Sequence, residues 1–191
     1  MNSEESELIK QLVSGNDKAF KVLFDSYKSM VYNTASGFLT NESDAEDITQ
    51  EVFLQIYRSI AHFKEESKLS TWIYRITITK CLDLLRKRKT KKRFAFITDI
   101  FDKENNKDKD LFVNYEHPGI LEENKELSKI LFKQIDKLPE NQRIAFVMSK
   151  VELLSYKEIS EVMQTSVSSV ESLIFRAKTN LKKRLEKYYK E

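Results

Sequence analysis

Residues that interrupt helices are scarce along this chain. Its 191 residues include only three glycines and two prolines, while Lys, Glu, Leu and Ile are abundant. Gly and Pro are the poorest helix formers, whereas Lys, Glu and Leu are among the best. Such a composition departs from that of an average globular domain. The sequence therefore predicts an all-α fold.

Apolar residues recur at helical spacing through residues 3–93 with few interruptions. The helices expected there cover about 3–13, 17–39, 42–62 and 69–92. Helical periodicity returns after residue 118, with Pro139 expected at the first position of a helix. The chain is long enough for one domain or two small ones, and the interruption favours two.

Residues 94–118 separate the two helical stretches. They are polar and acidic in the middle, keep no sustained period and close with Pro118. This composition is typical of a linker. We therefore expect two small helical domains, residues 1–93 and 119–191, joined by a flexible linker over residues 94–118.

The patterns that accompany catalysis are missing from the sequence. It has no Gly-rich phosphate loop, no paired Cys or His at metal-binding spacing and no nucleophile signature. The two histidines, His62 and His117, fall in different predicted parts of the chain. We expect a protein that is not an enzyme, with no catalytic residue, metal site or cofactor.

The cellular location is inferred from cysteine content and from hydropathy. The single cysteine, Cys81, excludes an intrachain disulfide framework, fits a reducing compartment and is expected to be a buried apolar residue. The first residues lack a basic segment followed by an apolar run, and no stretch approaches about 18 apolar residues. We expect a cytoplasmic protein without membrane insertion.

Residues 165–178, TSVSSVESLIFRAK, have two contrasting sides when placed on a helix. One side is apolar and suits a protein core: Val167, Val170, Ile174, Ala177, Leu181 and Leu185. The opposite side is small, hydroxylated or basic: Ser168, Ser169, Ser172, Arg176, Thr179 and Lys183. Small residues allow a close approach, and Ser and Arg bind phosphates or base edges. This side is a candidate for reading the major groove of DNA; the alternative is an ordinary solvated face.

The preceding residues, LLSYKEISEVMQ (153–164), predict a short helix ahead of this one. Ser155 and Glu158 have the spacing of a capping box. A short turn without the usual glycine follows, and either Thr165 or Ser166, or the pair Ser168 and Glu171, would cap the second helix. The two helices form a helix-turn-helix pattern, which favours DNA binding over a plain helical hairpin with solvated basic ends.

The helix expected over residues 69–92 carries a second basic surface. Its apolar side includes Leu69, Trp72, Ile73, Ile76 and Leu84, and a polar stripe far from it includes Lys68, Arg75, Thr79, Arg86 and Arg93. Residues 86–93, RKRKTKKR, are basic at seven of eight positions. Such a density of positive charge favours a polyanion. The chain is thus expected to bind DNA at two places, the basic helix and the helix-turn-helix.

Three short motifs extend this interpretation to a family. D-x-x-Q-E-x-F begins at residue 47, S-x-x-S-T-W-x-x-R-I at residue 67 and F-R-A-K at residue 175. In this order and spacing, residues 44–89 resemble region 2 of an extracytoplasmic-function (ECF) sigma factor of the sigma-70 superfamily, and residues 137–185 resemble its region 4. The resemblance implies a region 2 helical bundle and a region 4 helix-turn-helix domain. It also implies transcription initiation by core RNA polymerase at specific promoters.

The resemblance also implies partners and roles for individual residues. Core polymerase would bind through its beta-prime clamp coiled coil and beta flap, with the clamp contacting Asp47, Gln50, Glu51, Leu54 and Arg58. Minus-ten DNA, with one base flipped into the loop before the basic helix, would contact Phe63, Lys64, Ser67, Lys68, Trp72, Arg75, Thr79 and Arg86. Trp72 has core packing as its alternative. Minus-thirty-five DNA would contact the polar side of 165–183 named above.

Two further expectations accompany the family resemblance. An anti-sigma factor is an expected partner. The chain departs from many relatives at Thr79, Glu171 and Leu173, which bear on base preference. The alternative function is that of a two-domain helix-turn-helix regulator that binds operator DNA without polymerase.

Overall fold

The computed structural model describes residues 3–39, 41–101 and 125–188. Every regular element among them is helical, which confirms the predicted fold class. In chain order the elements are α1 (Ser3–Val13), α2 (Asp17–Phe38), α3 (Glu42–Ser59), η1 (Ile60–His62), α4 (Leu69–Phe101), α5 (Lys125–Ile135), α6 (Glu140–Lys150), α7 (Tyr156–Met163), α8 (Val167–Leu185) and η3 (Glu186–Tyr188), where η marks a 3-10 turn.

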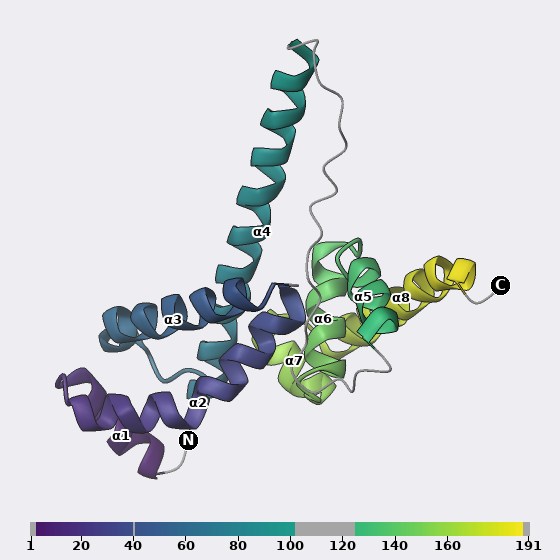
Figure 1. The fold of residues 1–191 in the computed structure, drawn as a ribbon. Helices are drawn as coiled ribbons and strands as arrows, with labels where there is room; N and C mark the ends of the chain where they lie inside the picture. Colours follow the sequence, from purple (N-terminus) through teal and green to yellow (C-terminus); the bar gives the residue numbers. More distant parts are fainter. Residues whose placement is uncertain (1–2, 40, 102–124, 189–191) are drawn as a thin grey trace.

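The N-terminal domain is built on α2, α3 and α4, which pack against one another with α1 beside α2 (Figure 1). Asparagine side chains begin two of these helices: Asn16 accepts from the backbone amides of Lys18 and Ala19, and Asn41 accepts from that of Ser43. The apolar sides of these helices meet in a core that includes Leu23, Val31, Phe38, Val52, Ile56, Leu69, Ile73 and Cys81. Cys81 is fully buried, as expected.

Helix α4 is longer than the sequence analysis expects. It continues beyond residue 92 to Phe101, so residues 94–101, the first part of the predicted linker, are helical. No glycine or proline stands in this stretch, and each residue added to an existing helix gains a hydrogen bond without a new nucleation cost. Residues 102–118 of the predicted linker lie outside the described residues.

The C-terminal domain consists of α5 to α8, with α6 packed along α8 and α7 beside both (Figure 1). Its core includes Val147, Met148, Ile159, Val170, Ile174, Ala177 and Leu181. Pro139 precedes α6 as its N-cap, one position before the place predicted for it, with an extended ψ of 143°. With this ψ, Pro139 lies outside the helix, but its carbonyl accepts the first hydrogen bond of α6, from the backbone amide of Arg143.

The two domains pack on each other, which the sequence analysis does not predict. α4 lies against α7, and α2 lies against α6. Among the described residues, no helix is long and apolar enough to cross a bilayer. No cluster of His, Cys, Asp and Glu side chains in that part of the chain is arranged to hold a metal ion.

Candidate polymerase- and DNA-binding surfaces

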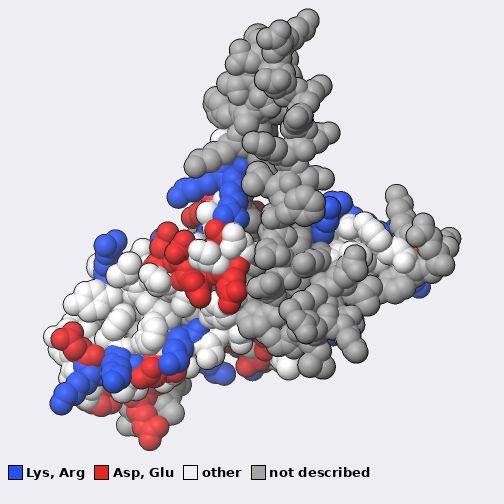
Figure 2. Space-filling model, in the orientation of Figure 1, with Lys and Arg blue, Asp and Glu red and all other residues white. Residues whose placement is uncertain are grey.

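Helix α3 has one buried side and one exposed polar side. Ala45, Ile48, Val52, Ile56 and Ile60 are buried against the rest of the domain. The predicted polymerase contacts are all exposed: Asp47, Gln50, Glu51, Leu54 and Arg58. Leu54 is 55% exposed, which adds an apolar side chain to this polar side. Acidic side chains gather where α3 begins, beside the basic side chains of α4 (Figure 2).

Ion pairs hold α3 against α4 next to this exposed side. Arg88 of α4 lies 2.6 Å from a carboxylate oxygen of Asp44. Lys80 lies 3.2 Å from Glu51. Because Asp44 is mostly buried and already paired, the exposed charge available to a partner comes from the residues that follow it in α3.

The loop between η1 and α4 forms a small aromatic site. The rings of Phe63 and Trp72 lie 5.0 Å apart, and both side chains are half-buried. Lys64 and Lys68 are exposed beside them and Ser67 is half-buried, while Glu65 takes a left-handed backbone with φ of 57°. The amide of Leu69 donates to Glu5 of α1, which ties the end of the loop to the domain. Phe63 and the two lysines of the loop therefore stand beside Trp72 in the first turn of α4.

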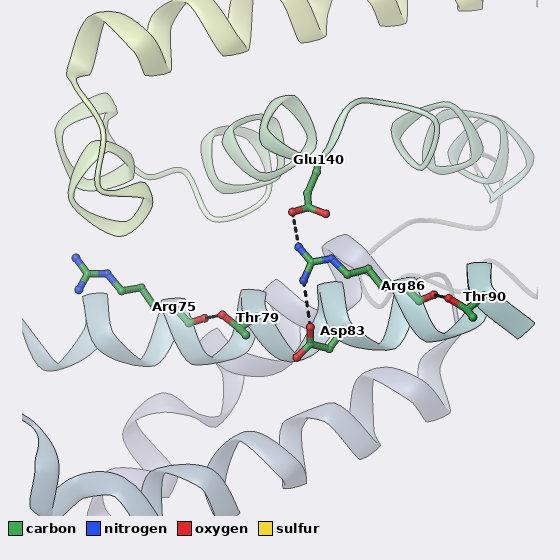
Figure 3. A network of polar contacts seen from close by, with 6 residues as sticks. All are labelled: Arg75, Thr79, Asp83, Arg86, Thr90 and Glu140. Carbon is green, nitrogen blue, oxygen red and sulfur yellow. Dashed lines mark hydrogen bonds and ion pairs between the residues drawn. The ribbon is translucent and has the colours of Figure 1, made fainter.

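The polar stripe of α4 faces the C-terminal domain (Figure 3). Arg75 donates to the backbone carbonyls of Glu161 and Val162, at 2.6 and 3.2 Å. Arg86 pairs with Asp83 of its own helix at 3.2 Å and with Glu140 of α6 at 2.7 Å. Thr79 is exposed, but its hydroxyl donates to the carbonyl of Arg75 within the helix. Arg75 and Arg86, two of the predicted DNA contacts, are thus occupied by protein in this arrangement.

The helix-turn-helix is formed by α7 and α8. Ser155 and Glu158 make the predicted capping box, and their hydrogen bonds lower the pKa of the Glu158 carboxyl below its ordinary value. The turn needs no glycine, because Gln164 takes the left-handed conformation with φ of 52°. Ser166 is the N-cap of α8 and accepts from the amide of Ser169, which settles the choice among the possible caps.

The polar side predicted for α8 is largely open. Ser168, Ser172, Arg176 and Lys183 are exposed, while Ser169 and Thr179 are half-buried. The hydroxyl of Ser169 joins that of Ser166 at 2.9 Å, so it takes part in the cap. Arg176 donates to the carbonyl of Ser172 in its own helix. The cationic and hydroxyl groups of this side therefore stand on one rigid helix.

One apolar assignment on α8 is corrected. Val167, expected in the core, is 45% exposed. As the first residue of the helix it precedes the turn that packs on α6 and α7, and the buried side starts at Val170.

Comparison with known families and proteins assigns the chain to a family. The sequence profile of Sigma-70 region 2 matches residues 23–91, and that of Sigma-70 region 4 matches residues 128–181. The ECF RNA polymerase sigma-E factor of Escherichia coli (strain K12) is 30% identical over 90% of this chain and 88% of its own length. The chain belongs to the ECF sigma factors of the sigma-70 family. The ECF RNA polymerase sigma factor SigW of Bacillus subtilis (strain 168) is 32% identical over 93% of this chain and 94% of its own.

Solved structures share the fold of this ECF sigma factor. CnrH in complex with the cytosolic domain of CnrY has a TM-score of 0.67 at 21% identity, covering 95% of this chain and 97% of that one. The sigma factor RpoE of Bartonella quintana, in complex with the anti-sigma factor NepR, has a TM-score of 0.63 at 19% identity, covering 88% and 98%. The ECF sigma factor described here directs promoter recognition by RNA polymerase and is not an enzyme.

A further residue of this ECF sigma factor stands on the exposed side of α8 and was missed by the sequence analysis. Phe175 is 70% exposed, and at 3.6 residues per turn it lies about 20° from Ser168 around the helix. Its phenyl ring is therefore accessible to a partner of this helix. At 100° per residue Phe175 falls away from the buried side of α8, so periodicity predicts its exposure even though the side chain is apolar.

Proposed function

We propose that the exposed side of α3 binds the beta-prime clamp coiled coil of core RNA polymerase. The support is the separation of the two sides of this helix: Asp47, Gln50 and Leu54 are exposed, while Ala45, Ile48, Val52 and Ile56 on the other side are buried. Carboxylates and an apolar side chain presented together suit an interface with a charged rim around an apolar centre. The beta flap is proposed as the contact of the C-terminal domain.

The loop before α4 and the stripe of α4 are proposed to bind the minus-ten element. Phe63 and Trp72 offer aromatic surface on which an unpaired base can stack, and Lys64 and Lys68 stand beside them. Ser67 offers a hydroxyl to the flipped base. Arg75, Thr79 and Arg86 continue along the helix, where the guanidinium groups would bind backbone phosphates of the opened strand.

Helix α8 is proposed to lie in the major groove of the minus-thirty-five element. Ser168, Ser169, Ser172 and Arg176 approach base edges, while Thr179 and Lys183 meet the phosphate backbone. Phe175 adds an apolar contact, and the apolar group exposed in the major groove is the methyl of thymine. The single observation that carries the minus-thirty-five assignment is the exposure of hydroxyl, guanidinium and phenyl groups on one side of a capped helix whose other side is buried.

Two proposals complete this account. The domains are proposed to extend over residues 1–93 and 119–191 as predicted. An anti-sigma factor is proposed as a partner, since the relatives CnrH and RpoE are seen in complexes with CnrY and the anti-sigma factor NepR, respectively.

The division of labour between the domains is tested on holoenzyme assembled from core polymerase and the full chain at a promoter it uses. Arg176→Ala should weaken protection of the upstream element from nuclease. Phe63→Ala should reduce permanganate reactivity of thymines in the opened minus-ten region while the upstream protection stays. Lys21→Ala, an exposed change in α2, is the control. Loss of the upstream protection by Phe63→Ala alone would contradict the assignment.

A further inference from the structure

We propose that Glu5 of α1 is a positioning residue for the minus-ten element: it caps the start of α4 and thereby holds the rings of Phe63 and Trp72 in place for an unpaired base. This inference rests on the proposed role of the loop before α4 in binding minus-ten DNA. It is carried by a hydrogen bond of 3.0 Å, in which the backbone amide of Leu69 donates to a carboxylate oxygen of Glu5, 64 positions away in the sequence.

The residue at the N-cap position of α4 is unsuited to capping. Lys68 holds this position, because its carbonyl accepts the first hydrogen bond of the helix, from the backbone amide of Trp72. A lysine ammonium has three donors and no acceptor, so it cannot accept from the amides of the first turn. Leu69 is fully buried, and a buried backbone amide needs a partner. Glu5 provides this partner from another helix.

Glu5 stands on the side of α1 that faces the domain. It precedes the core residues Ile9 and Leu12 at helical spacing and is itself half-buried. A carboxylate in such a place is unfavourable unless it accepts hydrogen bonds. Burial, and then the Glu5 carboxylate, raise the pKa of the Tyr27 hydroxyl in α2. The carboxylate therefore lies where α1, α2 and the start of α4 meet, and the amide of Leu69 accounts for its presence there.

Helix α1 contacts both ends of the loop. It packs against η1, which ends one residue before Phe63. Glu5 holds the amide of Leu69 at the other end. Trp72 lies in the first turn of α4, and helix ends that lack a cap fray. Because the rings of Phe63 and Trp72 pack at 5.0 Å, fraying of this turn would separate the aromatic surfaces that the base is proposed to meet.

An ordered site binds its ligand more tightly than one that must be ordered on binding. Loss of a side-chain cap shifts the equilibrium between the formed and the frayed first turn by about fivefold. Stability of the opened minus-ten region should change by up to the same factor. Binding of core polymerase and of the upstream element should not change, since the surfaces proposed for them lie on α3 and α8. Glu5 thus acts through Leu69 and Trp72 without touching DNA.

Trp72 reports on the cap directly, because it is the only tryptophan of the chain. The full chain is titrated with acrylamide, and the quenching constant of the Trp72 emission measures how open the site is. We expect this constant to rise for Glu5→Ala and to stay near the wild-type value for Glu5→Gln, whose amide oxygen has the same reach and accepts from Leu69. Glu4→Ala, an exposed change in the same turn of α1, is the matched control.

A local cap should replace the missing one. Lys68→Ser places a hydroxyl at the N-cap position, where it accepts from the amides of the first turn. Combined with Glu5→Ala, this change should return the quenching of Trp72 to the wild-type value. The double variant separates loss of the cap from a general loosening of α1, and circular dichroism follows the helix content of every variant.

Holoenzyme assembled from core polymerase and the full chain measures the effect on DNA. Permanganate reactivity of thymines in the opened minus-ten region should fall by up to about fivefold for Glu5→Ala. It should stay within about twofold of the wild type for Glu5→Gln, which loses only the charge facing the helix dipole. Affinity for core enzyme and nuclease protection of the upstream element should keep their wild-type values in both variants.

Wild-type quenching and wild-type promoter opening in Glu5→Ala would overturn the proposal. Equal losses in Glu5→Gln and Glu5→Ala would also overturn it, because the hydrogen bond to Leu69 would not be the cause. A loss of core affinity alongside the loss of opening would make Glu5 an ordinary stabilising residue. Failure of the proposed function looks different: the wild-type holoenzyme itself would leave the minus-ten thymines unreactive, while the quenching of Trp72 in the free chain would still report the cap.

Discussion

The hydroxyl of Tyr74 in α4 donates a hydrogen bond to a carboxylate oxygen of Glu152, 3.1 Å away, between the two domains. Tyr74 is only 7% exposed. Burial, and then the Glu152 carboxylate beside it, raise the pKa of the Tyr74 hydroxyl. Burial also raises the pKa of Glu152 above its ordinary value of 4.5. The packing of the two domains thus places a carboxylate where its charged form is disfavoured.

The packing of the two domains on each other should therefore depend on pH. Because the pKa of Glu152 is raised where the domains pack, its contribution to this packing is fully present below pH 4.5 and is lost as pH rises through the raised pKa. Glu152→Gln keeps an oxygen that accepts from Tyr74 and removes the charge, so it should strengthen the packing of the two domains at pH 7 and flatten its dependence on pH. The distance between spin labels that replace Lys21 in α2 and Lys182 in α8, measured from pH 4.5 upward, follows this loss.

Glu171→Gln, in the exposed part of α8, is the control for this charge removal. A Glu152→Gln protein whose two domains separate at pH 7 would show that the charged carboxylate favours the packing of the domains, contrary to this account.

Asp47→Ala and Gln50→Ala should weaken binding to core polymerase without unfolding the protein. Both side chains are exposed on α3, so truncation leaves the core intact. Truncation of a contact near the centre of an interface costs about 1 kcal/mol or more. Affinity for core enzyme, with circular dichroism melting alongside, measures the effect. Asp25→Ala in α2 is the matched control, and wild-type affinity for both α3 variants would remove this side from the interface.

Arg176→Ala and Lys183→Ala should weaken DNA binding in two different ways. Loss of an Arg that binds guanine through two hydrogen bonds costs about 1 to 3 kcal/mol and relaxes preference at one base pair. Loss of a Lys that binds phosphate weakens all sequences alike and reduces the slope of affinity against salt by about one unit. Holoenzyme binding to single-base promoter variants at several salt concentrations separates the two. If Arg176→Ala lowers the affinity for all promoter variants equally, the guanidinium of Arg176 binds phosphate and not guanine.

Phe175 should report on thymine methyl groups. Deoxyuridine lacks the methyl carbon of thymidine, and burying one such carbon is worth about 0.8 kcal/mol. Replacing thymidines of the minus-thirty-five element by deoxyuridine should weaken wild-type binding at one position and leave Phe175→Ala insensitive there. Equal sensitivity of the two proteins at every position would exclude the contact. Val22→Ala, an exposed apolar truncation in α2, controls for surface hydrophobicity.

Much of the fold could be predicted from local patterns. The scarcity of Gly and Pro predicts helices, and the spacing of Ser155 and Glu158 predicts where α7 begins. The buried and exposed sides of α3 could be predicted, because apolar residues that recur every three or four positions form one side of a helix and that side is buried. The end of α4 is less predictable. Residues 94–101 show no clear period, yet they continue a helix that is already nucleated.

The packing of the two domains on each other could not be predicted in this way. Periodicity identifies the apolar side of each helix but says nothing about which carbonyl a distant arginine will reach. Arg75 and Val162 are far apart in the chain and meet only because α7 packs on α4. A basic stripe therefore suggests DNA equally well whether its arginines are free or already bound to protein. Gly37 is the one local signal, since a glycine inside a helix usually has a packing reason.

The most direct test of the central claim is transcription in a purified system. Core RNA polymerase, the full chain and a library of promoter fragments are combined, and the 5′ ends of the transcripts are sequenced. The account predicts transcripts that begin at defined sites downstream of a shared pair of elements, and that disappear when the chain is omitted or carries Asp47→Ala with Gln50→Ala. Sequence-specific binding to DNA by the chain alone, with no defined starts when core enzyme is added, would contradict it.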